Sequence, residues 1–197
     1  MNKLILIRHG KTKCNLDGVY CGMTNVPLCP EGISELRELL QHTHYPSCEG
    51  YDIVTSGMKR TNETLHTLYG NLPFTVDAAF REMNLGVFET KSYEELKDRA
   101  DYQAWISGDV TANRTPGGES AQEMAARVYA RFTERMEGDG RKLMLFTHGG
   151  PIGFLMLLLF PGEREGWYDW QPKNGRGYMV ELEGTKALSY QPVPEET

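Results

Sequence analysis

Residues 4–10 have the sequence Leu4-Ile5-Leu6-Ile7-Arg8-His9-Gly10, an apolar run that ends in an arginine and a histidine. A strand that is apolar on both faces is typical of the middle of a parallel sheet, which helices cover on both sides. A second such run, Leu143–Thr147, ends in His148 and two glycines. Ligands of open parallel sheets bind outside the carboxyl ends of the strands. We therefore expect His9 and His148 to lie together at one edge of a sheet.

Strand and helix patterns alternate between and beyond these two runs. Short apolar runs predict strands at residues 51–55, 74–76 and, as the last strand, 178–182. Apolar residues at helical spacing predict helices at about 30–43, through Leu65 and Leu68, at 93–106, after the capping box 120–123, and from near Pro151. This alternation predicts an α/β fold, with three layers (α/β/α) around a mostly parallel central sheet. We expect residues 1–190 to form a single domain and residues 191–197 a frayed C-terminal tail.

Composition and charge argue against several classes of function. The net charge is −6 and no run of Lys or Arg occurs, so a nucleic-acid partner is not expected. The apolar runs are shorter than the ~20 residues that span a bilayer, and the N-terminus lacks the features of a signal peptide. The cysteines form no Cys-x-x-Cys pair and suit reduced thiols: Cys14, Cys21, Cys29 and Cys48. We expect a soluble cytoplasmic protein without a membrane partner, and the sequence leaves its oligomeric state open.

The side chains at the predicted strand ends suit phosphate chemistry. Ser56 and Arg60 follow the strand at 51–55, and Glu82 follows the strand at 74–76. Arg pairs with phosphate oxygens, a neutral imidazole can attack phosphorus, and a carboxylic acid can protonate a leaving alkoxide. No cluster has the spacing of metal ligands, and neither a Gly-x-Ser-x-Gly elbow nor a Walker loop is present. The sequence therefore predicts a phosphoryl-transfer site that uses no metal and no cofactor.

Each of these residues has an ordinary explanation when it is taken alone. Arg60 and Glu82 belong to types that are mostly exposed, and His148 would suit a hydrogen-bonded position in the core. An Arg-His-Gly triplet also arises by chance. The hypothesis rests on the order of the motifs, their spacing and their common placement at strand ends.

Taken together, the motifs resemble the histidine phosphatase superfamily, in its phosphoglycerate mutase-like branch. The resemblance begins at Arg8-His9-Gly10, with Thr12 and Asn15, and covers nearly the whole chain. The further matching segments are residues 20–28, Thr55-Ser56 with Arg60 and Glu63-Thr64, Arg81-Glu82 with Gly86 and Glu89, residues 116–120, and residues 147–150. This family implies a reaction through a phosphohistidine intermediate.

By this resemblance, His9 is the nucleophile that becomes phosphorylated, and Glu82 first donates a proton to the leaving group and then activates water. The implied catalytic set is His9, Glu82, His148, Arg8 and Arg60. The residues implied to hold the phosphate are Arg8, Asn15, Arg60, His148 and the backbone of Gly149. Further substrate contacts are expected at Thr12, Tyr20, Cys21 and Gly22.

The family contains mutases, which move phosphate between two hydroxyls, and phosphatases, which release it to water. The segment 89–116 between two of the motifs is too short for the cap of a 2,3-bisphosphoglycerate-dependent phosphoglycerate mutase. This favours a phosphomonoesterase that acts on a small phosphorylated metabolite. The compact chain most resembles the α-ribazole phosphatase group, which implies α-ribazole 5′-phosphate as substrate. The alternatives are the mutase and a catalytically silent protein of the same fold that binds a phosphate ligand.

Three further features bear on the site. Lys11 stands where many relatives carry Glu or Gln, and Thr90 replaces the usual Gly of its motif. The aromatic segment Trp167–Trp170 either flanks the pocket or covers the core, and we favour the second interpretation. Cys14 and Cys21 lie in the loop of the first motifs, so a thiol modification there is expected to inhibit by crowding the pocket.

Overall fold

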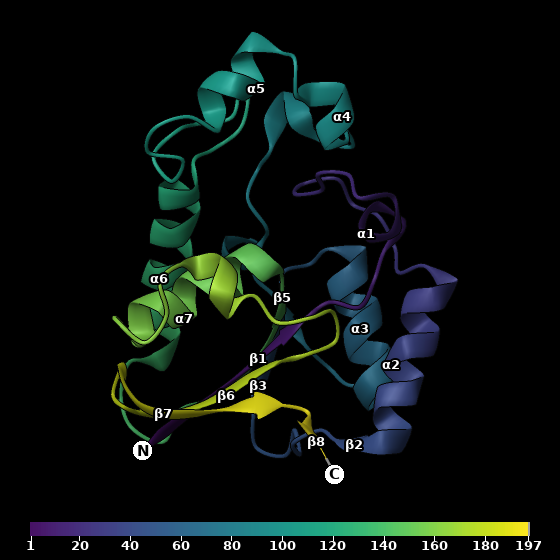
Figure 1. Ribbon diagram of the computed structural model, residues 1–197. Helices are drawn as coiled ribbons and strands as arrows, with labels where there is room; N and C mark the ends of the chain where they lie inside the picture. The colour runs from purple at the N-terminus through teal and green to yellow at the C-terminus, as the bar shows by residue number, and fades with distance from the viewer. Residues whose placement is uncertain (197) are drawn as a thin grey trace.

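The computed structural model describes residues 1–196, and strands and helices alternate along it (Figure 1). The strands are β1 (Asn2–Arg8), β2 (Thr43–His44), β3 (Asp52–Thr55), β4 (Thr75–Val76), β5 (Lys142–Thr147), β6 (Gly177–Glu183), β7 (Lys186–Val193) and β8 (Glu195–Glu196). The α-helices are α1 (Lys13–Asp17), α2 (Pro30–His42), α3 (Lys59–Tyr69), α4 (Tyr93–Leu96), α5 (Ala100–Trp105), α6 (Ala121–Met136) and α7 (Gly149–Leu159). Short 3₁₀ helices are η1 (Ala78–Phe80), η2 (Gly86–Phe88) and η3 (Trp167–Trp170).

β1 lies inside the central sheet, whose strand order is β4-β3-β5-β1-β6-β7. On one side of β1 the pairs β1–β5, β5–β3 and β3–β4 are parallel, and on the other side β6 and β7 pair in antiparallel fashion. The register of β1 with β5 places Arg8 opposite Thr147, so both strands end at the same level. β2 and β8 form a separate pair. The structure confirms the predicted α/β fold with a mostly parallel sheet.

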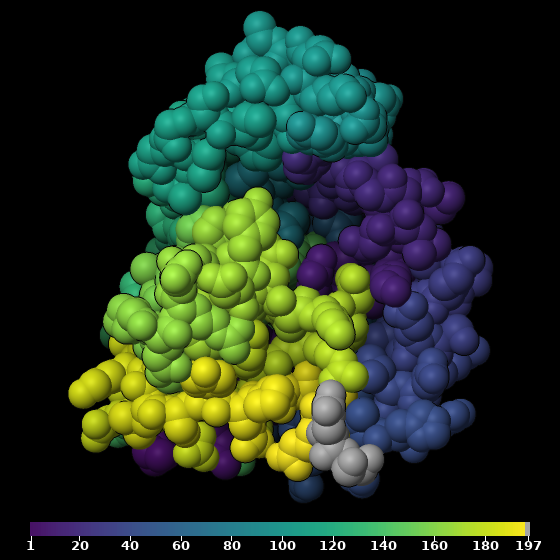
Figure 2. Space-filling view, viewed as in Figure 1, coloured from purple at the N-terminus to yellow at the C-terminus, as the bar shows by residue number. Residues whose placement is uncertain are grey.

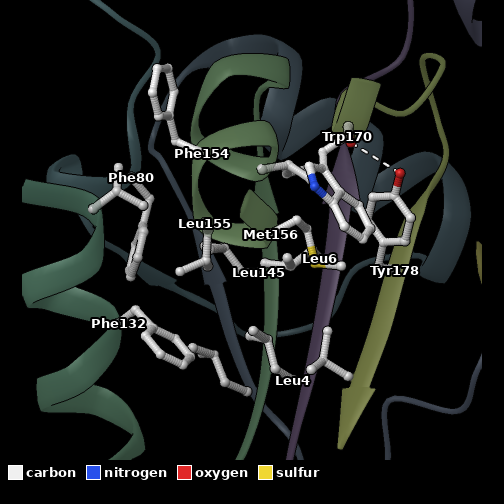
Figure 3. Close-up of a cluster of buried hydrophobic side chains, with 14 of the residues drawn as sticks. Leu4, Leu6, Phe80, Phe132, Leu145, Phe154, Leu155, Met156, Trp170 and Tyr178 are labelled. Carbon is white, nitrogen blue, oxygen red and sulfur yellow. Dashed lines mark hydrogen bonds between the residues drawn. The ribbon is translucent and has the colours of Figure 1, made fainter. Parts of the chain in front are cut away.

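The alternating side chains of β1 build a separate core on each face of the sheet. Leu4 and Leu6 pack in the cluster that includes residues of α6 and α7, part of which Figure 3 shows. Ile5 and Ile7 pack in the cluster that includes residues of α2 and α3, and Figure 1 shows the two helix pairs on opposite sides of the sheet. All of these β1 side chains are fully buried, and each such burial contributes about 1.5–3 kcal/mol. The two cores thus fix the strand end from which His9 projects.

The segment between η2 and α6 lies beyond the carboxyl ends of the strands (Figure 1). Its small core consists of Phe88, Leu96 and Tyr102, with Tyr20 and Trp105 packed against them. The prediction of one helix over residues 93–106 is wrong, because α4 and α5 are separate. Leu96 and Tyr102 would lie about 120° apart around a continuous helix. The break between α4 and α5 allows both side chains to pack against Phe88.

The C-terminal end also differs from the prediction. The strand expected at 178–182 is β6, but it is not the last strand, because β7 and β8 follow. Residues 191–193 pair with β6 and residues 195–196 pair with β2, so this part of the predicted tail is ordered by strand pairing. Thr197 lies outside the described residues, and the single domain over residues 1–190 stays a prediction.

The helix after β5 is apolar on nearly all sides, as is typical of a helix buried in a core. It begins at Gly149, so Pro151 lies in its first turn, as predicted, but not at its first position. Within residues 1–196, no helix has both the length and the apolar character that crossing a membrane requires.

Candidate active site

The carboxyl ends of β1 and β5 bring His9 and His148 together, as the sequence predicts. The amide of His9 donates to the carbonyl of Thr147 (3.0 Å), which ties the two strand ends to each other. The ring centroids of the two histidines are 5.2 Å apart. Both residues are almost completely buried, with 6% and 0% of their surface exposed. Two segments that are distant in the sequence therefore form one site.

The surroundings of His9 leave one ring nitrogen available for attack. Its Nδ1 lies 2.7 Å from the carbonyl oxygen of Gly10, which can only accept a hydrogen bond. The proton of the neutral ring is therefore on Nδ1, and Nε2 carries a lone pair. Burial lowers the pKa of His9 well below its usual value, and the positive charges of Arg60 and Arg8 lower it further. His9 is neutral at pH 7, which is the form that acts as a nucleophile.

His148 is fixed by hydrogen bonds at both ring nitrogens. Nε of Arg60 donates to its Nδ1 (3.2 Å), and its Nε2 lies 2.8 Å from the hydroxyl of Ser56. Because Nδ1 accepts, Nε2 carries the proton and donates to Ser56, whose hydroxyl also contacts Thr61 (3.1 Å). Burial, followed by the charge of Arg60, lowers the pKa of His148 well below its usual value. That His148 holds phosphoryl oxygens stays a prediction.

Arg60 is a buried cation and not the surface residue that its type alone would suggest. Only 1% of it is exposed, and its guanidinium donates to the carbonyls of Thr24 (2.8 Å) and Gly22 (2.6 Å) as well as to His148. Among the described contacts, these bonds use three of its five N–H groups. One hydrogen on each terminal nitrogen is therefore available to an anion.

Arg8 supplies a second positive charge close to His9. Its Nη1 donates to the carbonyl of Pro172 (2.8 Å), whereas its Nε is buried and has no partner within residues 1–196. A buried donor that is left unpaired costs about 1–3 kcal/mol, which a bound oxyanion would offset. The two arginines, one of which carries the unpaired Nε donor, suit a tetrahedral anion next to the ring of His9.

Glu82 faces the first turn of α7. Its Oε2 accepts from the amide of Gly150 (3.0 Å) and its Oε1 from the amide of Met83 (2.9 Å). A Cβ at Gly150 would lie 2.2 Å from Oε1, so a glycine is required for the carboxylate to approach the helix this closely. The preceding Gly149 opens α7, whose first-turn amides have no partner inside the helix. The structure therefore brings Glu82 to the strand end that carries His148.

The predicted substrate-contact residues lie in the loop after β1. Thr12 is buried, and its amide and hydroxyl both donate to Oδ1 of Asn15 (3.0 Å each). Asn15 is exposed on α1, and no described contact within residues 1–196 joins it to the histidines or arginines. Its place in the phosphate site stays a prediction. Tyr20 and Cys21 line a large cavity. The carbonyl of Gly22 accepts a hydrogen bond from Arg60.

Glu89 holds this loop in place, a role that the motif match does not indicate. Its carboxylate accepts from the amides of Gly22, Met23 and Thr24 and from the hydroxyl of Thr24, at 2.6–3.1 Å. The carbonyls of Gly22 and Thr24 in turn accept from Arg60. Glu89 therefore fixes the backbone that orients Arg60. Its place in a matching motif was the available signal, but only the fold shows which amides it meets.

Thr64 is another buried residue that the sequence analysis did not assign to the site. Its hydroxyl accepts from the amide of Gly10 (2.9 Å) and donates to the carbonyl of Arg60 (2.6 Å). It thus links the turn after His9 to α3. Two hydroxyl groups therefore help to position ionisable residues. Ser56, which precedes α3, contacts His148, and Thr64 of α3 contacts the backbone of Arg60.

A cavity of about 430 Å³ opens beside Glu82, and Figure 2 shows the surface hollowed beneath the α4–α5 segment. Its aromatic walls are Tyr20, Trp105, Phe154, Trp167 and Tyr168. Aliphatic side chains and methionines make up most of the rest, and Glu82 is the one Asp, Glu, Lys, Arg or His among the described lining residues. The cavity is therefore suited to an apolar group bound beside Glu82.

The aromatic segment 167–170 both covers the core and lines the cavity. Trp170 is fully buried in the core, where its carbonyl accepts from the hydroxyl of Tyr178 (3.0 Å; Figure 3). Trp167 and Tyr168 instead line the cavity, and Trp167 stacks on Phe154 with 4.7 Å between ring centroids. The favoured prediction of a core cover is right for Trp170 and also for Trp167, which packs against the same core while it lines the cavity. It is wrong for Tyr168, which is exposed and lines the cavity.

The charged groups at the strand ends can perform a definite set of steps. Two arginines can hold an anion, a neutral imidazole can attack it, and a carboxyl group can exchange a proton with the departing oxygen. In the described part of the chain, no three His, Cys, Asp or Glu side chains are grouped so that they could hold a metal ion. The arrangement supports phosphoryl transfer by protein groups.

Known proteins resemble this chain in sequence and in fold. Probable phosphoglycerate mutase GpmB of Salmonella paratyphi C (strain RKS4594) is 27% identical over 160 residues, which cover 79% of this chain and 74% of the relative. The crystal structure of the alpha-ribazole phosphatase from Shigella flexneri superposes with a TM-score of 0.78 and 24% identity, covering 94% of this chain and 93% of its own. TTHB049 from Thermus thermophilus gives a TM-score of 0.70 and 27% identity, covering 95% and 98%. The sequence pattern of the histidine phosphatase superfamily (branch 1) matches residues 4–189, and the chain belongs to this superfamily.

Proposed function

We propose that this protein is a phosphomonoesterase that needs no metal ion and passes the phosphoryl group through His9. The observation that carries the proposal is the environment of His9, a buried neutral ring with Nδ1 bound to Gly10 and with Arg8 and Arg60 close enough to lower its pKa. Such a ring can act as a nucleophile, and the two charges next to it stabilise the phosphoryl group under attack.

The reaction takes place in two steps. Nε2 of His9 attacks phosphorus, the bond from phosphorus to the ester oxygen breaks, and Glu82 gives its proton to the departing oxygen. A water molecule then attacks the phosphohistidine while Glu82 takes a proton from it, and the bond from phosphorus to nitrogen breaks. Inorganic phosphate leaves and His9 is restored. Arg8 and Arg60 hold the phosphoryl oxygens in both steps.

The cavity beside Glu82 supports an ester whose organic part is bulky and largely apolar. Aromatic rings stack well on flat aromatic groups, and Tyr20, Trp105 and Tyr168 offer such faces. Phosphoglycerate is small and carries a carboxylate, which would meet no cation among the described residues that line the cavity. Phosphatase activity is therefore favoured over mutase activity. We propose α-ribazole 5′-phosphate, an aromatic base on a ribose phosphate, as the substrate.

The experiment that tests this function is phosphate release from a panel of esters in EDTA, for the wild type and for His9→Ala. The panel contains α-ribazole 5′-phosphate, 3-phosphoglycerate, fructose bisphosphate and p-nitrophenyl phosphate. We expect release that persists in EDTA, is lost in His9→Ala and is fastest for the aromatic ester. Transfer between 2- and 3-phosphoglycerate without release would show a mutase instead. If neither activity is found, a silent protein that binds phosphate ligands becomes the better account.

The proposal includes a cytoplasmic location and the absence of nucleic-acid and membrane partners. In its support, Cys14, Cys21, Cys29 and Cys48 are all free thiols, as is usual in a reducing compartment. The net charge of −6 would repel the phosphates of a nucleic acid. Cell fractionation tests the first part, and retention of the protein on immobilised DNA or anionic vesicles would contradict the second.

A further inference from the structure

The Pro-Gly-Gly-Glu-Ser motif before α6 has no part in the proposed chemistry, yet its glutamate makes a specific contact. Both oxygens of Glu119 accept from Arg127 of α6, Oε1 from Nη2 (2.6 Å) and Oε2 from Nε (3.1 Å). Oε1 also accepts from the amide of Asn84 (2.9 Å). The side chains of Glu119 and Arg127 are only 17% and 27% exposed. A partly buried pair with two parallel bonds has a fixed geometry.

Arg127 turns its other donors towards the segment that carries Glu82. Nη1 donates to the carbonyls of Ala79 (2.7 Å) and Arg81 (2.9 Å). Nη2 donates to the carbonyl of Glu82 itself (2.9 Å). With the two bonds to Glu119, all five N–H groups of the guanidinium are used. One side chain therefore fixes three carbonyls in this short segment, and the last belongs to Glu82.

This segment has little other support from regular structure. Residues 81–85 belong to no helix or strand, so no ladder of backbone hydrogen bonds determines their path. Glu82 must nevertheless reach the amide of Gly150 at 3.0 Å and the edge of the cavity. The hydrogen bonds from the Arg127 guanidinium to these carbonyls hold the backbone in place instead.

We infer that Arg127, held by Glu119, is a positioning residue for the proton donor Glu82. It sets the backbone from which the Glu82 carboxyl group reaches the leaving oxygen. The inference rests on the proposed function, because it requires Glu82 to act as an acid. Lysine cannot replace arginine here, since one ammonium group cannot span a carboxylate and three carbonyls.

The test compares leaving groups of different basicity. A general acid matters for an alkyl phosphate and matters little for p-nitrophenyl phosphate, whose phenolate departs without a proton. The measured quantity is kcat/KM, which reports formation of the phosphohistidine and leaves out the later hydrolysis step that both esters share. In Arg127→Lys, kcat/KM for the alkyl phosphate should fall at least about tenfold, and kcat/KM for p-nitrophenyl phosphate less than about threefold. Glu82→Gln should show the same contrast in larger form, with a loss of about 10²–10⁴ on the alkyl phosphate.

Arg131→Lys is the matched control. Arg131 lies one turn further along α6 and binds Asp77 (2.7 Å), but it makes no described contact with the carbonyls of residues 79–82. The ratio of the two activities should therefore stay at the wild-type value.

Glu119→Gln is the second variant, needed where Arg127→Lys does not fold. It keeps Arg127 but weakens the bidentate pair, and we expect the same contrast at a smaller size.

The outcomes separate the inference from the function on which it rests. Equal losses on both esters, or an unchanged ratio in Arg127→Lys and Glu119→Gln, would overturn the inference and leave Arg127 a purely structural residue. A wild type that cleaves both esters, with no contrast in Glu82→Gln, would overturn the inference because Glu82 is then not the acid, while the phosphatase function stands. A wild type that cleaves neither ester would overturn the proposed function itself.

Discussion

His9 and His148 show how burial and neighbouring charge act on a single residue. Both histidines have lost water, and both lie near Arg60, so a second positive charge is disfavoured at each. Among the described contacts, the same guanidinium keeps two N–H groups without a protein acceptor. The group that keeps His9 neutral is therefore also a group that, in the proposed reaction, attracts the phosphoryl oxygens.

Thr90 carries strain that a glycine would relieve. Among residues 1–196 it is the one residue other than glycine with a positive φ, at 62°. This conformation costs a residue with a Cβ about 1–2 kcal/mol. Thr90→Gly should raise the free energy of unfolding by about 0.5–1 kcal/mol, once the greater freedom of glycine in the unfolded chain is subtracted.

Urea denaturation measures this change, with Thr90→Ala as the control. Both variants lose the hydrogen bond from the Thr90 hydroxyl to the carbonyl of Glu89 (2.7 Å), so the difference between them isolates the effect of φ. The alanine variant should show no gain. A glycine variant that is no more stable than the alanine variant would show that no strain is stored there.

Cys21 lines the cavity, but its thiol should react slowly. Burial raises the pKa of Cys21 to about 12, although Arg60 acts in the opposite direction. Compared with a free cysteine, roughly 10³-fold less thiolate is present at neutral pH. Iodoacetamide should therefore abolish the proposed phosphatase activity slowly at pH 7.5 and about tenfold faster for each pH unit above it. Cys21→Ser should abolish the inactivation, and full labelling of Cys21 with unchanged activity would contradict the expected crowding of the pocket.

At the scale of elements, the loop at residues 22–24 depends on one carboxylate. Glu89 accepts from its amides, and Arg60 binds its carbonyls. Glu89→Gln places an NH₂ group against amide donors and should release the loop together with Arg60. Since hydrogen bonds to a charged group contribute about 1.5–3 kcal/mol, the inhibition constant for inorganic phosphate should rise by about tenfold or more.

Glu95→Gln is the matched control for this element. Glu95 caps α4 at an exposed position, where it accepts from the amide and hydroxyl of Ser92 (2.8 Å each). The substitution removes a carboxylate from the same part of the chain, but this carboxylate accepts no hydrogen bond from the amides of residues 22–24. Competitive inhibition by phosphate should be unchanged in this variant. Equal inhibition constants for the wild type and Glu89→Gln would mean that the loop does not depend on the carboxylate.

The elements that could be predicted from the sequence are those whose burial leaves a pattern. β1 and β5 are apolar on both faces because helices cover both sides, and α6 shows its capping box at Ser120. β7 left no such pattern, because it is an edge strand with mostly exposed or half-buried residues and a proline at residue 192. The division into α4 and α5 depends on tertiary contacts with Phe88, which helical spacing alone does not reveal.

At the scale of the whole molecule, the two buried histidines couple stability to pH. In the unfolded chain each takes up a proton near pH 6.5, whereas in the folded chain each stays neutral to a lower pH. Below pH 6.5 the unfolded state therefore binds more protons, and the protein loses stability as the pH falls. The loss is at most about 1.4 kcal/mol per pH unit for each histidine.

Denaturation between pH 6.5 and 5.5 measures this effect. The free energy of unfolding should decrease with falling pH in the wild type and less steeply in His9→Asn, which removes one of the two groups. The same slope in both proteins would mean that the pKa of His9 is not depressed in the folded state.

The grouping of the residues proposed for catalysis could be predicted from the sequence, but the cavity could not. His9, Arg60, Glu82 and His148 each follow a strand, so their order and spacing place them at one edge of the sheet. The cavity instead combines the loop after β1 with α5 and η3, and Tyr20, Trp105 and Tyr168 meet only in the folded chain. The contact of Glu82 with Gly150 also depends on a close approach that no sequence pattern records.

The most direct test of the account is a search for the phosphohistidine itself. The wild type is mixed with ³²P-labelled substrate in EDTA, quenched in alkaline denaturant within milliseconds, and digested so that the labelled peptide can be mapped. We predict a label that is stable in alkali, labile in acid and attached to His9, and that is absent from His9→Ala. Hydrolysis of the substrate without any protein label, or with the label on another residue, would contradict the assignment of His9 as the nucleophile.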